Sequence, residues 1–353
     1  MHNPVTRRSL RGATRHAVAV AVAALLVACG NSSSEGPATE PVAGAPEPLP
    51  SAPEPAVAAP LEAMPPGRVV PVGSMPEGMV FDGTTGLVVI GLRSPDGVVL
   101  VDRDGQLVRR VDLDGAPRHL ALAGPGGPVL VPAEGSDQLV TVALPDGRIE
   151  SVVPVGRNPH DAVAVGRRVY VGNEFADSVS VVDDGKVVDE IPAPVQPGGI
   201  GASGDAVAVV GVRGRQTKVF DAASLDELGN LVTGAGPTHV VGDQDRLFVA
   251  DTNGDAVLVL SVAPEVGEIA RVEAPGAPYG MTVDPVRRQL WITLTATNRV
   301  VGFDISGAEP RPVADFASVR QPNSIAVDPE SGTIYVAGTA DGVLQIVTAD
   351  DLG

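Results

Sequence analysis

A pattern that begins with proline recurs along most of the chain. An apolar side chain lies three residues after each of these prolines, and a second one usually lies five residues after it. Successive prolines of this kind are 41, 42, 38, 40, 41 and 44 residues apart. A period near 40 residues with strand-like content is typical of β-propeller blades, each of which is a four-stranded antiparallel sheet. We call these seven positions the anchor prolines: Pro76, Pro117, Pro159, Pro197, Pro237, Pro278 and Pro322.

A second apolar run follows each anchor proline after a turn, and it is continuous rather than alternating, as in residues 87–90 (LVVI) and 247–250 (LFVA). A strand with this pattern is buried on both faces. Such burial fits a propeller, in which each blade is packed between two others. A third strand and a fourth, outer strand complete each repeat. The pattern therefore predicts an all-β fold, a single seven-bladed β-propeller.

The seventh repeat has room for only three strands, from Pro322 to about Val347. The stretch from Gly67 to Val72 (GRVVPV), ahead of the first anchor proline, has the outer-strand pattern. We expect it to pair with the last blade and close the ring, which removes exposed strand edges. The propeller domain is predicted to span residues 67–353.

The first 28 residues have the features of an export signal. Four arginines precede an uninterrupted apolar run from Ala17 to Ala28, and Cys29 follows. At 12 residues the run is too short to span a bilayer, which needs about 20. The segment 26–29 (LVAC) is similar to a bacterial lipobox, so we expect cleavage before Cys29, lipidation of its thiol and anchoring on the extracytoplasmic side of the membrane. The alternative is a plain secretory signal.

Residues 6–10 (TRRSL) are also similar to a twin-arginine export motif, and the alternative is an ordinary basic region of a signal peptide. Cys29 is the only cysteine in the chain. Neither a disulfide nor a cysteine-ligated zinc site is therefore available to the rest of the protein.

Residues 29–66 form a predicted tether between the lipid and the propeller. From Gly30 to Pro66 the composition is rich in Pro, Ala, Ser and Glu and includes no basic residue. Such a stretch cannot bury a core and favours extended polyproline conformations, so we expect disorder and a reach of at most ~110 Å at ~3.1 Å per residue.

The formal charge of the chain is −18, and removal of the signal lowers it to about −22. A surface this acidic repels phosphate backbones, which disfavours nucleic acid as a partner. We expect a monomer whose partners are the membrane, through the lipid, and a small molecule or an envelope protein.

Residues whose side chains could bind a ligand or take part in catalysis follow the anchor prolines or lie in the turns between the second and third strands. The strand order of a propeller places both groups on one rim. Of five histidines, two leave with the signal and the other three fall one or two residues after an anchor proline. The predicted ligand-binding rim consists of Glu77, Arg118, His119, His160, Asp161, Asn173, His239, Asp251, Tyr279 and Asn323.

One interpretation of this rim is a divalent metal site formed by His119, His160, His239 and Glu77. Three imidazoles with an open position suit Zn²⁺, whereas a carboxylate-rich set suits Ca²⁺ or Mg²⁺. The alternative is that the histidines fill a variable turn position and bind neighbouring backbone groups. No catalytic set is complete: the sequence contains no nucleophile elbow and no phosphate-binding loop.

Residues 170–197, which begin Tyr170-Val171-Gly172-Asn173, resemble the repeat of the YVTN family of bacterial surface β-propellers. That resemblance implies a propeller and no particular reaction. Pro76-Glu77-Gly78 is similar to the opening of gluconolactonase-type propellers, which use such a Glu as metal ligand, and residues 278–304 resemble a repeat of streptogramin lyases. We therefore expect a binding or scaffolding lipoprotein; the alternative is a metal-dependent lactonase or a C–O lyase.

Overall fold

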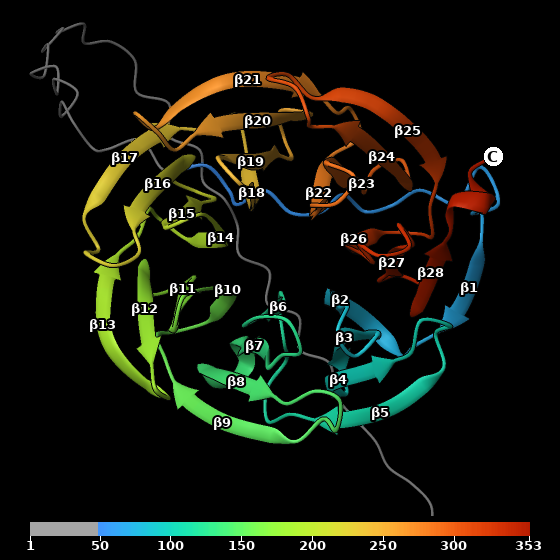
Figure 1. The fold of residues 1–353 in the computed structure, drawn as a ribbon, viewed down its shortest axis with the longest axis horizontal. Coiled ribbons are helices and arrows are strands. Elements are labelled where there is room, and N and C mark those ends of the chain that lie inside the picture. The colour runs from blue at the N-terminus through green and yellow to red at the C-terminus, as the bar shows by residue number, and fades with distance from the viewer. Residues whose placement is uncertain (1–48) are drawn as a thin grey trace, which may run out of the picture. The chain divides into compact units, whose positions relative to one another are not determined.

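The structure, a computed structural model, describes residues 49–353. The predicted signal peptide (1–28), Cys29 and the tether up to residue 48 lie outside the described residues. Seven four-stranded antiparallel sheets form a ring (Figure 1). The predicted all-β, seven-bladed propeller is confirmed. None of the helices among residues 49–353 is long and apolar enough to cross a membrane.

Each blade runs from an inner strand beside the central axis to an outer strand at the circumference (Figure 1). The strands of the first four blades are β2 (Ser74–Asp82), β3 (Leu87–Ser94), β4 (Asp96–Val101), β5 (Leu107–Asp112); β6 (Ala121–Leu122), β7 (Val129–Ala133), β8 (Gln138–Val142), β9 (Ile149–Pro154); β10 (Pro159–Val165), β11 (Arg168–Asn173), β12 (Ser178–Asp183), β13 (Lys186–Pro192); and β14 (Pro197–Ser203), β15 (Ala206–Gly211), β16 (Gln216–Asp221), β17 (Glu227–Val232). Those of the other three are β18 (Pro237–Asp243), β19 (Arg246–Asp251), β20 (Ala256–Ser261), β21 (Gly267–Glu273); β22 (Pro278–Asp284), β23 (Gln289–Leu294), β24 (Arg299–Asp304), β25 (Arg311–Ala317); and β26 (Pro322–Val327), β27 (Ile334–Gly338), β28 (Val343–Val347) with β1 (Arg68–Pro71). Two short 3₁₀ helices, η1 (Glu134–Ser136) and η2 (Ala349–Asp351), complete the described elements.

The ring closes through β1, which pairs with β28 in the register Arg68↔Ile346 to Pro71↔Val343. The last blade is therefore made of three strands from the C-terminal end and one from the N-terminal end, as the sequence predicts. With β1 in place, each of the seven sheets among residues 49–353 has four strands and packs between two complete sheets. Closure therefore leaves neither face of a sheet without a neighbour.

Seven clusters of buried apolar side chains make up the core, one in each interface between neighbouring blades. This placement explains the continuous apolar runs, because successive side chains of a middle strand point to opposite faces and both faces pack against another blade. Trp291 belongs to one cluster and lies 6.2 Å from the ring of Phe316, centroid to centroid.

Inner strands approach each other closely around the axis, and glycine makes this possible. Gly78 has φ +73°, and a Cβ there would lie 2.0 Å from the carbonyl oxygen of Arg118 in the next blade. A Cβ at Gly242 would lie 1.7 Å from the carbonyl oxygen of Ala202. Only glycine fits such positions without moving the backbone.

We call the face of the ring that carries the anchor prolines the upper face, and the opposite one the lower face. On the upper face, a repeated hydrogen bond joins the turns of successive blades. An Asp or Asn with positive φ ends the turn between the second and third strands. Its side chain accepts a hydrogen bond from the backbone N–H of the residue directly before the next anchor proline. The donor and acceptor pairs are Asn158 to Asp137 (2.7 Å), Gln196 to Asp177 (2.7 Å), Ala277 to Asp255 (2.9 Å) and Gln321 to Asn298 (2.9 Å). Short polar side chains tolerate this backbone conformation better than other residues do.

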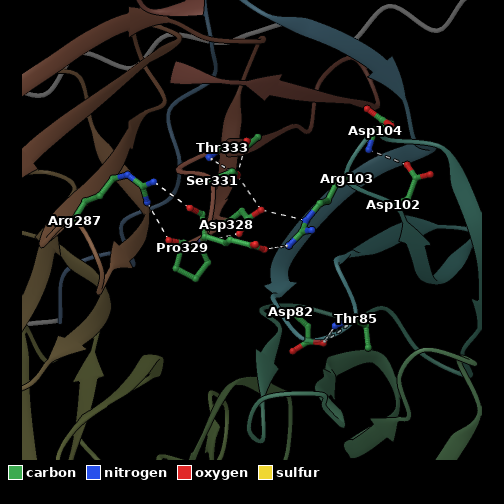
Figure 2. Close-up of polar contacts among 11 residues, drawn as sticks. Asp82, Thr85, Asp102, Arg103, Asp104, Arg287, Asp328, Pro329, Ser331 and Thr333 are labelled. Carbon is green, nitrogen blue, oxygen red and sulfur yellow. Dashed lines mark hydrogen bonds and ion pairs between the residues drawn. The ribbon is translucent and has the colours of Figure 1, made fainter. Parts of the chain in front are cut away.

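Lower turns of the first, sixth and seventh blades are organised by buried aspartates. Asp82, Asp284 and Asp328 each accept hydrogen bonds from their own turns. Asp328 also joins the last blade to the first, because its Oδ2 lies 3.2 Å from Nε of Arg103 (Figure 2). Asp82, Asp284 and Asp328 therefore have a structural role.

We expect the Asp328→Ala variant to lose about 2–3 kcal/mol of unfolding free energy, because a buried acceptor of charged and neutral donors is removed and its donors are left unpaired. Urea unfolding measures the loss. Asp350→Ala, at an exposed position near the C-terminal end, is the control and should change stability by less than about 0.5 kcal/mol. Equal stabilities of the two variants would contradict this role for Asp328.

Candidate functional site

Three histidine rings from the second, third and fifth blades meet at the upper end of the channel. Ring centroids lie 4.3 Å apart for His119 and His239, 5.0 Å for His119 and His160, and 6.3 Å for His160 and His239. Tyr279 of β22 adds a fourth ring, 4.4 Å from that of His239. We call these four residues the histidine cluster.

The anchor prolines bring these side chains together. In six of the seven inner strands the pairing register shifts directly after the proline, so that the next one or two residues form a β-bulge. A bulge re-aims the side chain that it carries. The residues in these bulges include Glu77, His160, His239, Tyr279 and Asn323.

Hydrogen bonding sets the protonation of His160. Nε of Arg118 donates to Nε2 of His160 at 3.0 Å, so the ring proton of His160 is on Nδ1. Burial, and then the charge of Arg118, holds the pKa of His160 well below its usual range. Burial, followed by the neighbouring His239 and His160, does the same to His119, and burial lowers the pKa of His239 to about 3. All three imidazoles are therefore neutral at physiological pH.

Two arginines and two glutamates from the first and second blades form a compact ion-pair network beside the rings. Nη1 of Arg118 lies 3.3 Å from Oε1 of Glu77, and Nη2 of Arg93 pairs with Glu134. Nε of Arg93 lies 3.9 Å from Oε2 of Glu77. The network contains two positive and two negative side chains, so its charges balance. Such pairing offsets the cost of removing charged groups from water.

A chamber of about 270 Å³ lies below the histidine cluster, on the axis of the ring. Apolar side chains supply much of its wall, among them Met79, Ile200, Val240, Met281 and Ile325. A second cavity of about 410 Å³ shares part of this wall and extends down to Pro285 and Pro329 in the lower turns. The channel therefore leads from the histidine cluster to the lower face.

Polar groups of the chamber wall are His119, His239, Asp161, Asn323 and Ser324. Asp161 accepts hydrogen bonds from the backbone N–H groups of Ala162 (2.8 Å) and Ile200 (3.1 Å), but enclosure in the channel wall still raises the pKa of its carboxyl to about 7. Nε2 of His119 and Oδ1 of Asn323 are buried and have no hydrogen-bond partner among residues 49–353. Two residues of the chamber wall, His119 and Asn323, thus carry a buried, unsatisfied hydrogen-bonding atom next to apolar surface.

Part of the predicted tether lies over the upper end of the channel. Residues 49–59, which we call the strap, hydrogen-bond to the fourth and sixth blades. Ala52, Pro53 and Glu54 share a small cavity of about 20 Å³ with three members of the histidine cluster, His160, His239 and Tyr279. Composition predicted disorder for this stretch and did not reveal these contacts.

Asn173 and Asp251, also predicted for the rim, are fully buried. Nδ2 of Asn173 donates to the hydroxyls of Ser178 and Ser180, and the carboxylate of Asp251 accepts from three backbone N–H groups. Asn173 braces its own turn, whereas Asp251 joins its turn to the loop before Pro237; neither residue lines the chamber or the cavity below it. Sequence position alone cannot distinguish such a bracing residue from an exposed one.

A metal site is the other prediction for these residues. Within the part of the chain that the structure describes, no three His, Cys, Asp or Glu side chains are placed so that they could hold a metal ion. One nitrogen of His160 is occupied by Arg118, and Glu77 is paired with Arg118 and Arg93. The three imidazoles come together as neutral hydrogen-bonding groups, and we derive no metal-dependent step from them.

Solved structures similar to this chain are β-propellers of varied function. A hydrazine synthase structure from Kuenenia stuttgartiensis is 18% identical (TM-score 0.68), and a streptogramin B lyase is 12% identical (TM-score 0.68); each match covers 80% of this chain and 98% of the other. The β-propeller domain of Cps50 (Swd1) from Myceliophteria thermophila is 11% identical (TM-score 0.67), with coverage of 80% and 100%. At these identities the likeness shows the fold alone. No protein-family model and no curated protein sequence matches the chain, so membership of the YVTN family stays a prediction.

The raised pKa of Asp161 makes a pH-dependent prediction. The unfolded carboxyl has a pKa near 3.8 and the folded one about 7, so the folded state binds more protons and the wild type loses stability as pH rises from about 4 to above 7. Asp161→Asn has no such loss. We expect its unfolding free energy to increase relative to wild type over this window, as measured by urea unfolding at several pH values.

Asp189→Asn, on the exposed outer strand β13, is the matched control, and its difference from wild type should stay constant with pH. The lowered pKa values of the three histidines have the opposite effect, a loss of stability below about pH 6.5, but they contribute equally to each variant and cancel in the comparison. A pH-independent difference for Asp161→Asn would contradict the prediction.

Proposed function

We propose that this chain is an exported lipoprotein whose propeller binds a small, uncharged, hydrogen-bonding molecule in the chamber below the histidine cluster. The observation that carries the proposal is the pair of buried, unpartnered polar atoms in the chamber residues His119 and Asn323. An unsatisfied polar atom in a buried site costs about 1–3 kcal/mol, and a bound molecule that supplies the missing partner recovers that cost.

The charge balance of the site favours an uncharged ligand. The imidazoles are neutral, and the nearby Arg118 and Glu77 neutralise each other. Burial favours the protonated form of Asp161, whose pKa is about 7, so below that pH an ionic ligand would enter the chamber without a free counter-charge, which is costly away from water. Apolar walls with a few convergent polar groups are typical of small-molecule sites.

The chamber itself has room for a small metabolite. A volume of about 270 Å³ corresponds to roughly nine water molecules at ~30 Å³ each. It is slightly below the range of about 300–1,000 Å³ that is usual for drug-sized ligands. Entry is from the lower face, because the strap lies over the upper end.

Binding is tested with small polyols, lactones and amides, screened against the purified protein by saturation-transfer NMR. We expect Asn323→Leu to weaken binding of any hit at least tenfold, since the loss of one hydrogen bond in a buried site is worth about 1.4 kcal/mol or more. Met281→Leu, a volume-conserving change in the apolar wall, is the control. Unchanged affinity in Asn323→Leu would overturn the assignment of the site to this chamber.

Anchoring is proposed from the sequence, in which Cys29 ends a lipobox-like segment. We expect Cys29→Ser to abolish incorporation of labelled palmitate and to move the protein from the membrane fraction to the soluble fraction, because no other residue of the chain provides a thiol for diacylglycerol. Fractionation with a radiolabel measures both effects. A membrane-bound Cys29→Ser protein would contradict the anchor.

A further inference from the structure

The strap follows a defined path over the upper face of the ring. It begins on the fourth blade, where Nε of Arg213 donates to the carbonyl oxygen of Pro50 at 2.9 Å. It ends on the sixth blade, where the N–H of Ala56 donates to Oγ1 of Thr295 at 3.0 Å and Nδ2 of Asn298 donates to the carbonyl oxygen of Ala59 at 2.8 Å. Between these attachments the strap lies over the mouth of the channel.

The middle of the strap fits the mouth through a small side chain, a proline and an acid. Ala52 packs against the apolar cluster between the fourth and fifth blades, and Pro53 is buried. This segment lines one small cavity together with aromatic and aliphatic side chains of the mouth, such as Tyr279 and Val212, and with Arg118. Aromatic-lined grooves bind proline-rich segments at low entropic cost, because such segments are already extended before they bind.

The sequence contains this segment twice. Ala-Pro-Glu-Pro occurs at residues 52–55, in the mouth, and again at residues 45–48, outside the described residues. A repeated tetrapeptide in a tether is more than a spacer requires, since any mixture of Pro, Ala and Glu would give the same reach.

We propose that the channel mouth is a peptide-docking site for Ala-Pro-Glu-Pro segments, and that its resident ligand is the strap of the same chain. Docking closes the upper end of the channel and holds the tether against the rim at three points. The site is formed by residues of the mouth and rim, so the inference does not depend on a ligand in the chamber below.

Competition between the strap and a free peptide tests the proposal. The protein is the full mature chain made soluble by Cys29→Ser, and the probe is a fluorescent peptide of residues 49–60 (LPSAPEPAVAAP). A tethered segment has an effective concentration of the order of millimolar, so the wild-type strap should exclude the peptide. A chain with Pro46→Gly, Glu47→Lys, Pro53→Gly and Glu54→Lys, in which both Ala-Pro-Glu-Pro segments are altered, should bind the peptide at least tenfold more tightly than wild type, as measured by fluorescence anisotropy.

Variants of the docking surface distinguish specific docking from adhesion. Added to the weakened strap, Arg213→Ala should reduce peptide affinity several-fold because the donor to the Pro50 carbonyl is lost, whereas Arg215→Ala in the same turn should not. No saturable binding to the weakened-strap chain, equal binding to wild type, or equal binding of a scrambled peptide would each overturn the proposal.

Hydrogen exchange provides a second measurement that needs no peptide and no destabilised chain. The Ala56 amide of the wild type should exchange at least tenfold more slowly than in the free peptide, and Thr295→Val should remove that protection by removing its acceptor. An unprotected Ala56 amide in the wild type would overturn the docked strap. Protection that rises with protein concentration would assign the strap to a second copy and overturn docking within one chain.

Discussion

The structure depends on the burial of both faces of every blade. Apolar clusters occupy all seven interfaces between neighbouring sheets, so each blade is stable only between two others. A ring with one blade incomplete would expose an apolar face and a free strand edge together. Pairing of β1 with β28 is therefore a condition for the whole fold, and the salt bridge of Arg103 with Asp328 strengthens the same junction at its lower end.

The same constraint creates the candidate site. Seven inner strands converge on one axis, with glycine at the closest approaches, and five of them begin at an anchor proline. Whatever residue follows the proline is carried by a bulge or turn to the upper end of the channel. In this chain three of these residues are histidines, and the burial that the ring imposes keeps them neutral. The histidines thus offer uncharged hydrogen bonding, while Glu77, Arg93, Arg118 and Glu134 form a network that is balanced in charge.

Most of the architecture could be predicted from the sequence, because the repeat determines it. The period gives seven blades, and the short last repeat requires the strand near Gly67 to close the ring, which β1 does. The convergence of His119, His160 and His239 also follows from their position after the anchor prolines. The roles of Asn173 and Asp251 do not follow, because a turn side chain can point into its own turn or away from it, and only the local hydrogen bonds decide. The strap was missed for a related reason: its composition rules out a core, but a few residues can still dock on a surface that the propeller supplies.

The two ends of the channel differ, because the strap covers the upper end and the lower end is open. At its upper end lie the neutral rings and, above them, residues 52–54 of the strap; at its lower end the wall consists of strand ends and proline turns such as Pro285 and Pro329. A molecule in the chamber would contact His119 and Asn323 from below, and a peptide in the mouth would contact Arg118 and Tyr279 from above. His239 is the one histidine that lines both spaces, because its ring separates them. A molecule in the chamber and a segment in the mouth would therefore both contact His239.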